Sequence, residues 1–153
     1  MYHDEEIYDD RYYLNLPTDS GRIASLLALL EFGAEDSVCE IGCAAGDFLA
    51  AISPAIRYGI GLDISEPAIR AANALKNKHG LANIEFEQVS ANDFALRGEN
   101  AGRFDYVLLL DVTEHIDDET VAAVLESAKQ LLKSGGLLVL HTPNLSYWIE
   151  QLK

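Results

Sequence analysis

The chain has 153 residues, of which 49% are hydrophobic and 24% charged, a balance typical of one folded domain and not of a disordered segment. Its 25 acidic and 11 basic residues give a net charge of −14, which disfavours binding to the phosphate backbone of nucleic acids. Because the sequence shows neither a signal peptide nor an apolar run long enough to span a membrane, we expect a cytoplasmic protein.

The chain is predicted to begin with an irregular arm over residues 1–17, which is acidic and rich in tyrosine. Three of these tyrosines, Tyr8, Tyr12 and Tyr13, are candidates to cover a ligand site. Filling a groove beside the sheet is the alternative, and the sequence does not distinguish the two.

A helix is expected next, with an N-cap among residues 18–20 and an end at Gly33. A strand over residues 37–41 then leads into a glycine-rich loop, residues 42–46, and a short helix over residues 47–53. The apolar residues of the first helix recur at the spacing of one helical face: Ile23, Leu26, Leu27 and Leu30.

The middle of the chain alternates strands with helices. A second strand over residues 58–62 ends at Asp63, and Ser65 is placed to cap the helix that follows. A third strand over residues 84–89 precedes the segment 90–103, which is predicted to be mostly loop with one helical turn.

Residues 104–110 are apolar except for Asp105, a pattern that is typical of a central parallel strand covered on both faces. An acidic pair at 117–118 then opens a helix that residues 133–136 end, and a fifth strand is expected over residues 137–141. A last helix is expected over about residues 145–152. The predicted buried stripe of the long helix is Val121, Val124, Leu125, Ala128 and Leu132.

This order of elements predicts a single α/β domain over residues 1–153. The fold is expected to be doubly wound, with three layers and a mostly parallel sheet in the strand order 3-2-1-4-5. In such sheets ligands bind at the carboxyl ends of the strands, where the order reverses between the first and fourth strands.

The strongest functional signal is the sequence Val-Cys-Glu-Ile-Gly-Cys-Ala-Ala-Gly at residues 38–46. A glycine-rich turn between a strand and a helix lets a ligand approach the backbone closely. The turn does not match the dinucleotide fingerprint G-x-G-x-x-G, because its closing glycine, Gly46, comes one residue early. Its spacing, an acid followed by G-x-(G/A)-x-G, resembles motif I of class I S-adenosylmethionine-dependent methyltransferases.

The resemblance continues in the order of that family. Asp63 ends the second strand, where an acid can accept hydrogen bonds from both ribose hydroxyls, and residues 90–93 occupy the place of the adenine contact. Residues 104–116 resemble the fourth motif of the family. Residues 131–144 resemble the helix, turn and strand after it, and end like the fifth strand of small-molecule O- and C-methyltransferases.

The resemblance implies a Rossmann-like domain that binds S-adenosyl-L-methionine and transfers its methyl group to an O, N or C atom of an unidentified acceptor. The acidic composition favours a small-molecule acceptor. For Asp93 and its neighbours a helix N-cap is the alternative role. The cofactor-binding residues implied are Glu40, Gly42, Cys43, Ala44, Gly46, Asp63, Ile64, Ala91, Asn92, Asp93, Leu110 and Asp111.

His115 is the candidate catalytic residue, as a general base on an acceptor hydroxyl, and a packing role in its own loop is the alternative. Asp111, Glu114 and His115 are metal-ligand residue types close together, as in methyltransferases of RNA 3′ ends. We expect no metal site, because no further histidine follows His141 and the charge is unsuitable for RNA. The two cysteines lack the second ligand pair of a zinc site and are expected to be reduced thiols.

Two departures from the family bear on function. Ala44 stands at the middle glycine position and adds a methyl group to the turn. The chain also ends shortly after the fifth strand, where the family adds a sixth and a seventh. We therefore expect either a piece of a longer protein or a minimal variant, whose exposed sheet edge would favour a homodimer.

Two alternative functions stay open. One is a non-catalytic S-adenosylmethionine-binding or scaffold module of a larger protein. The other is a nicotinamide-dependent oxidoreductase, which the spacing of the glycine-rich turn disfavours.

Overall fold

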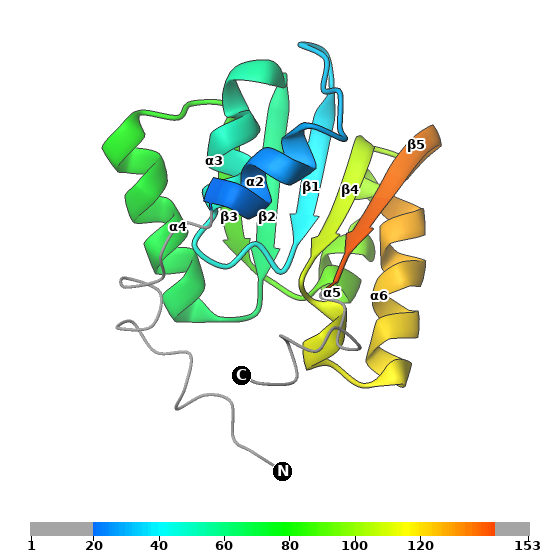
Figure 1. The fold of residues 1–153 in the computed structure, drawn as a ribbon. Helices are drawn as coiled ribbons and strands as arrows, with labels where there is room; N and C mark the ends of the chain where they lie inside the picture. Colours follow the sequence, from blue (N-terminus) through cyan, green and yellow to red (C-terminus); the bar gives the residue numbers. More distant parts are fainter. Residues whose placement is uncertain (1–19, 143–153) are drawn as a thin grey trace, which may run out of the picture.

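The computed structural model describes residues 20–142, built around a five-stranded sheet (Figure 1). The strands are all parallel and lie in the order β3-β2-β1-β4-β5, which confirms the predicted doubly wound fold. The strands are β1 (Ser37–Ile41), β2 (Tyr58–Asp63), β3 (Ile84–Gln88), β4 (Phe104–Leu110) and β5 (Leu132–His141).

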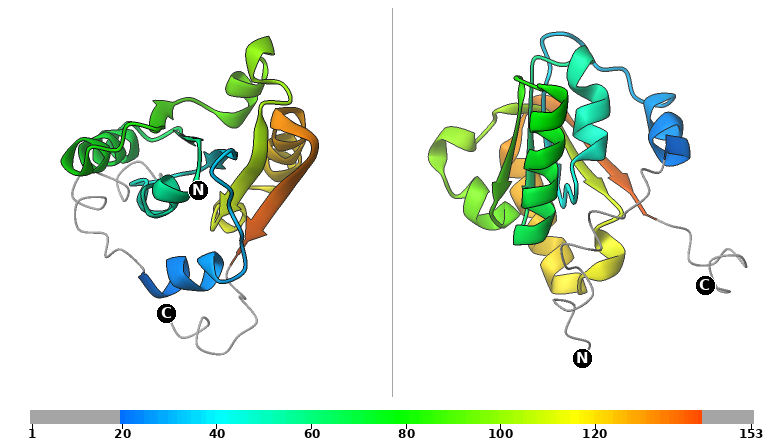
Figure 2. Two further views of the ribbon diagram at one scale, coloured as in Figure 1. Left: turned by 90° about the horizontal axis from the view of Figure 1, so that it is seen from above. Right: turned by 90° about the vertical axis from the view of Figure 1, so that its left-hand side faces the viewer.

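Helices lie on both faces of the sheet and give it three layers (Figure 2). Helices α2, α3 and α4 lie on one face, and α5 and α6 lie on the other. The helices are α2 (Ser20–Leu27), α3 (Asp47–Ile52), α4 (Glu66–His79), α5 (Ala91–Ala95) and α6 (Asp118–Leu131), with 3-10 helices η2 (Ser53–Ala55), η3 (Gly98–Asn100) and η4 (Thr113–His115).

The side chains of β4 alternate between two hydrophobic clusters, one on each face of the sheet. Val107 and Leu109 join the cluster packed by α5 and α6, whereas Leu108 and Leu110 join the cluster packed by α2 and α3. All four side chains are buried, which explains why the carboxyl-terminal part of this strand is uniformly apolar.

Two of the predicted helix N-caps are confirmed. Ser65 Oγ accepts a hydrogen bond from Ala68 N at 3.3 Å and caps α4. Asp117 Oδ1 accepts from Thr120 N at 2.8 Å and caps α6. These caps satisfy backbone donors that the first turn of a helix otherwise leaves without a partner.

Several predicted boundaries were wrong. Helix α2 ends at Leu27 and not at Gly33, although Leu30 still packs against the core beyond the end of the helix. Strand β5 begins at Leu132 and not at residue 137. A register shift between β4 and β5, with Gly135 at a φ of 81°, lets the strand include the glycines that the sequence indicates as a stop.

Segment 90–103 is more helical than the single turn predicted, since it contains both α5 and η3. In α6 the fully buried apolar side chains are Ala128 and Leu131, whereas Leu132, predicted to belong to this stripe, lies in β5. The tyrosine-rich arm and the helix predicted over residues 145–152 lie outside the described residues.

Strand β5 is the edge strand beside β4, and its side chains are only partly covered. Leu137, Leu138 and Leu140 remain 54%, 41% and 47% exposed. No helix within residues 20–142 combines the length and the apolar character that crossing a membrane requires.

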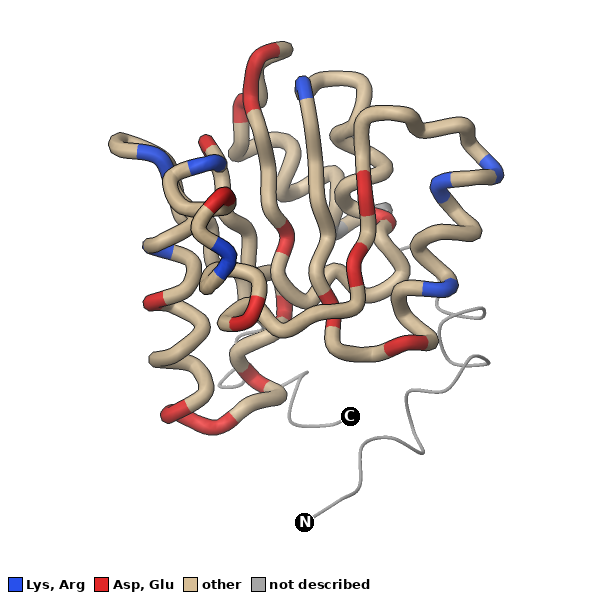
Figure 3. The backbone as a smooth tube through the Cα atoms, turned by 180° about the vertical axis from the view of Figure 1, so that it is seen from behind, with Lys and Arg blue, Asp and Glu red and all other residues tan. Residues whose placement is uncertain are grey.

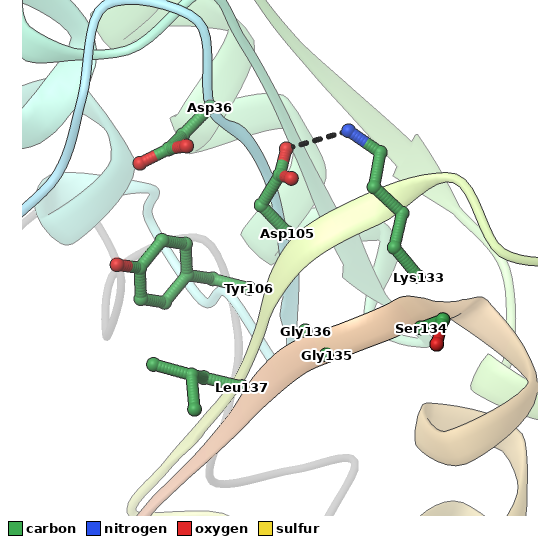
Figure 4. A pocket seen from close by; sticks show the side chains of 8 residues that line it. All are labelled: Asp36, Asp105, Tyr106, Lys133, Ser134, Gly135, Gly136 and Leu137. Carbon is green, nitrogen blue, oxygen red and sulfur yellow. Dashed lines mark hydrogen bonds and ion pairs between the residues drawn. The ribbon is translucent and has the colours of Figure 1, made fainter.

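At the amino ends of the strands, Asp105 joins β1, β4 and β5 beside a cavity of about 240 Å³ (Figure 4). Its Oδ2 accepts hydrogen bonds from Ser37 N, Ser37 Oγ and Lys133 Nζ, each at 2.8 Å. Partial burial alone would raise the pKa of Asp105, but the bonds from Lys133 and Ser37 outweigh it and lower the pKa to about 2.

We expect Asp105→Asn to lower the free energy of unfolding by about 1–3 kcal/mol at neutral pH, because a charged hydrogen-bond acceptor is lost. Since the folded-state pKa lies below the unfolded value of about 3.9, this stabilisation is present above that pH and is lost as pH falls toward about 2. Urea unfolding as a function of pH, with the exposed Glu99→Gln as control, measures it. An identical pH dependence for Asp105→Asn and the wild type would contradict the expectation.

Candidate active site

The glycine-rich turn, residues 42–46, joins β1 to α3 at the point where the strand order reverses. Three of its residues have left-handed backbone conformations: Gly42 (φ 73°), Ala44 (φ 47°) and Gly46 (φ 79°). Such conformations turn the chain sharply and leave its backbone groups at the carboxyl edge of the sheet.

Close neighbours require glycine at both ends of the turn. A Cβ atom on Gly42 would lie 2.5 Å from Val112 Cγ2, and one on Gly46 would lie 2.7 Å from Phe86 Cε1. Val112, two residues after the end of β4, and Phe86 of β3 therefore pack directly on the turn that follows β1. The ends of three strands thus meet at one place.

Hydrogen bonds fasten the turn to the end of β2. Gly42 N and Cys43 N both donate to Leu62 O, at 2.8 and 3.1 Å. Ala44 N donates to Asp63 Oδ2 at 3.0 Å. The extra methyl group of Ala44 is therefore accommodated, at the cost of a left-handed backbone that residues with a Cβ atom rarely adopt.

Asp63 is the acid that the sequence places at the end of β2, and the structure sets it beside the turn. Its Oδ1 accepts from Ser65 N at 2.9 Å, while its Oδ2 holds Ala44 N. Burial raises the pKa of Asp63, and the backbone hydrogen bonds from Ser65, Ala44 and Ile64 partly offset that effect. The neighbouring Ile64 is 76% exposed, so an apolar surface adjoins the carboxylate.

Glu40 and the two cysteines lie beneath the turn. Glu40 is 3% exposed, and Cys39 and Cys43 are buried free thiols. Burial raises the pKa of both thiols, and the neighbouring Glu40 carboxylate raises it further, so both are protonated at neutral pH. A Cβ atom on Gly61 would lie 2.8 Å from Cys43 Sγ, so Cys43 packs inward and can offer the site only its backbone.

At the start of α5, Asp93 and its neighbour Ser90 take part in capping the helix, which was the alternative to a ligand contact. Ser90 is the N-cap, and its Oγ accepts from Asp93 N at 3.1 Å and donates to Asp93 Oδ2 at 2.7 Å. Ser90 thus caps the helix and also binds the Asp93 side chain. Asp93 is exposed, but its carboxylate already has this structural partner.

The remaining predicted residues of α5 also have structural contacts. Ala91 is 5% exposed and belongs to the core, and Ser127 Oγ of α6 donates to Asn92 Oδ1. The segment still adjoins the site, because Val89 N donates to Asp63 O at 3.0 Å. Contact with a ligand would therefore come mainly from its backbone.

The end of β4 lies on the other side of the turn. Leu110 is 4% exposed and faces the core, while Asp111 has a φ of 58°. His115 follows in η4, where it is exposed and its N donates to Val112 O at 3.1 Å. The structure therefore brings Asp111 close to the turn and places His115 one short helix further away.

One contact at this edge was missed by sequence reasoning. His141 Nδ1, at the end of β5, lies 2.5 Å from Asp111 Oδ1. The two residues are 30 positions apart, so no local pattern indicates the pair. The available signal was that Asp111 directly follows β4 and His141 ends β5. These strands were predicted to be neighbours, and the carboxyl ends of neighbouring parallel strands meet at one edge of the sheet.

The carboxyl edge of the sheet is acidic. The lower part of Figure 3, where the strands end, carries mostly acidic positions. In the chain, Asp63 ends β2, Asp111 directly follows β4 and Glu114 lies in η4. Among residues 20–142, no three His, Cys, Asp or Glu side chains are grouped so that they could hold a metal ion. The edge therefore favours a cationic ligand over an anionic one.

A protein-family model described as a methyltransferase domain matches residues 16–153. The ubiquinone biosynthesis O-methyltransferase of Leptothrix cholodnii is 28% identical to this chain, and the match covers 70% of this chain and 44% of that protein. The enzyme of the same name from Cereibacter sphaeroides is 36% identical, and the match covers 69% of this chain and 40% of that protein. Chondramide synthase of Chondromyces crocatus is 37% identical over 73% of this chain and 3% of that protein. The chain thus spans less than half the length of these relatives.

Solved structures share the fold at low sequence identity. A Pyrococcus horikoshii protein superposes with a TM-score of 0.78 at 23% identity, covering 100% of this chain and 67% of that one. A SAM-dependent methyltransferase of Thiobacillus denitrificans, solved with S-adenosyl-L-homocysteine, gives a TM-score of 0.69 at 20% identity, covering 92% and 55%.

We expect Gly46→Ala to lower the free energy of unfolding by about 2–4 kcal/mol, because the new methyl group must displace the Phe86 ring. Gly80→Ala is a matched control with a similar φ of 64° and no atom within 4 Å, so its cost is the backbone strain alone, about 1–2 kcal/mol. Chemical denaturation compares the two. Equal losses would show that the turn is not closely packed.

Proposed function

The chain belongs to the methyltransferase domain family, and we infer from this premise that it binds S-adenosyl-L-methionine at the turn of residues 42–46 and serves methyl transfer. The observation that carries the proposal is the contact between this turn and Asp63, whose Oδ2 accepts from Ala44 N at 3.0 Å. The contact places a carboxylate beside a backbone cradle, as a ligand with hydroxyl donors requires. The Thiobacillus methyltransferase solved with S-adenosyl-L-homocysteine supports the choice of ligand.

The charge of the site supports this ligand over a dinucleotide. S-adenosyl-L-methionine carries a sulfonium and an ammonium group, which suit an acidic edge, whereas a dinucleotide brings a negatively charged pyrophosphate. Asp47 lies in the first turn of α3, where a pyrophosphate would need an uncharged or positive neighbour.

Each predicted residue has a role in the proposed site. The backbone of Gly42, Cys43, Ala44 and Gly46, above the buried Glu40, would hold the amino-acid end of the cofactor. Asp63 would accept from the ribose hydroxyls, and the exposed Ile64 would cover one face of the adenine. The remaining wall would come from Ala91, Asn92, Asp93, Leu110 and Asp111.

When bound, the cofactor supplies a methyl group that its sulfonium already activates. The residues of this chain therefore have to align donor and acceptor and to keep both in place, and proximity can account for much of the rate. The relatives named as ubiquinone biosynthesis O-methyltransferases support a small-molecule acceptor. The exposed leucines of β5 are compatible with a homodimer formed along that strand.

A second candidate is a module that binds the cofactor without transferring methyl groups. The match to 3% of chondramide synthase supports the place of such a module in a larger protein, because the matched segment is a small part of that protein. The two candidates differ in one outcome: both bind S-adenosyl-L-homocysteine, but a module methylates no acceptor.

Calorimetric titration with S-adenosyl-L-homocysteine tests the binding proposal. We expect saturable binding, no binding of nicotinamide adenine dinucleotide, and at least about tenfold weaker binding in Asp63→Ala, since hydrogen bonds to a charged acceptor are lost. Glu99→Gln, an exposed acid outside the site, should bind like the wild type. Binding of the dinucleotide, or no binding of either ligand, would refute the proposal.

A further inference from the structure

Asp111 and His141 form a carboxylate–imidazole pair at the ends of two adjacent strands. The register of β4 and β5 sets Leu110 opposite His141, and Asp111 N donates to His141 O at 2.8 Å. The side chains meet as well, with His141 Nδ1 2.5 Å from Asp111 Oδ1. The imidazole is therefore fixed through both its backbone and its ring.

The pair lies next to the proposed cofactor site, with its imidazole accessible. Val112, which packs on Gly42, directly follows Asp111. The His141 side chain is 39% exposed and that of Asp111 23% exposed, so the ring is the more accessible partner. Asp111 also has a φ of 58°, a conformation that costs a residue with a Cβ atom on the order of 1 kcal/mol.

We propose, resting on the function proposed above, that His141 is the general base for a phenol-type hydroxyl of the methyl acceptor and that Asp111 is its positioning residue. With Nδ1 held by the carboxylate, the neutral imidazole carries its hydrogen on Nδ1 and leaves Nε2 as the acceptor. This is the arrangement by which a carboxylate orients a histidine base in other enzymes.

The chemistry of the step defines the class of acceptor. The acceptor oxygen forms a bond to the methyl carbon, the carbon–sulfur bond breaks with its electron pair remaining on sulfur, and the hydroxyl proton passes to His141 Nε2. A phenol has a pKa of about 10, so its proton is within reach of an imidazole base at neutral pH. A carboxylate acceptor would have no proton to remove and would need no such base.

Two other titratable groups lie at this edge. Glu114 of η4 accepts a hydrogen bond from Thr142 Oγ1 at 3.3 Å, and His115 is exposed in the same 3-10 helix. His115 is the candidate base that the sequence indicates. Since the two histidines lie on different elements, single substitutions distinguish them.

The test compares the full chain with His141→Gln, Asp111→Asn, His115→Gln and the exposed His79→Gln as control. The probe is 3,4-dihydroxybenzoate, a phenolic acceptor, with S-adenosyl-L-methionine, and the release of S-adenosyl-L-homocysteine is measured against pH. We expect His141→Gln to lower kcat about 100-fold near neutral pH and to make the rate follow the ionisation of the phenol at higher pH, and Asp111→Asn to lower kcat about tenfold. His115→Gln and His79→Gln should keep the wild-type pH profile.

Two further readouts do not depend on turnover. The affinity for S-adenosyl-L-homocysteine should change less than about twofold in His141→Gln. Nitrogen NMR of the wild type should show the neutral His141 ring protonated on Nδ1, and Asp111→Asn, which suits a left-handed position, should lose that preference.

The outcomes separate this inference from the function on which it rests. No binding of S-adenosyl-L-homocysteine to the wild type refutes the proposed function itself. Binding with a wild-type rate and pH profile in His141→Gln refutes the role of His141. Binding by a wild type that does not methylate the phenolic probe overturns the assigned class of acceptor.

Discussion

The attachment of the glycine-rich turn to the end of β2 is the constraint on which the site depends. Leu62 O accepts from two backbone donors of the turn, and Asp63 Oδ2 accepts from a third, Ala44 N. These bonds hold a backbone with three left-handed residues in one conformation and fix the Asp63 carboxylate beside it. A ligand that contacts both therefore meets a site whose parts are already in place.

The order of the strands determines which residues surround the turn and Asp63. Because β4 lies beside β1 and β5 beside β4, the ends of all three strands meet at the carboxyl edge. Val112 then packs on Gly42, and the Asp111–His141 pair lies one strand further out. Donor binding and acceptor chemistry are thus proposed for adjacent parts of one acidic edge, which suits a cationic methyl donor.

The sequence predicted what local patterns encode. The apolar run of β4, the cap at Ser65 and the turn of residues 42–46 each follow from neighbouring residues, and the strand order follows from the alternation of elements. Prediction from the sequence failed for features that depend on contacts between residues distant in the chain. The start of β5 depends on pairing with β4 through an irregular register.

The candidate site, like the fold, was predictable from the sequence only where local patterns define it. Its turn and Asp63 were found from spacing along the chain, whereas the partners of their side chains come from tertiary contacts. Asp93 illustrates the limit, because its place after β3 indicated a ligand contact, while the hydrogen bond that its carboxylate accepts from Ser90 Oγ is seen only in the structure. The Asp111–His141 pair had no local signal at all.

Amide chemical-shift mapping of the labelled chain with S-adenosyl-L-homocysteine tests the central claim most directly. The account predicts saturable shifts confined to the carboxyl edge, at residues 42–46, Asp63 and Ile64. Asp105 and Lys133, at the opposite edge of the sheet, should not move. Shifts centred on that opposite edge, or no saturable shifts anywhere, would contradict it.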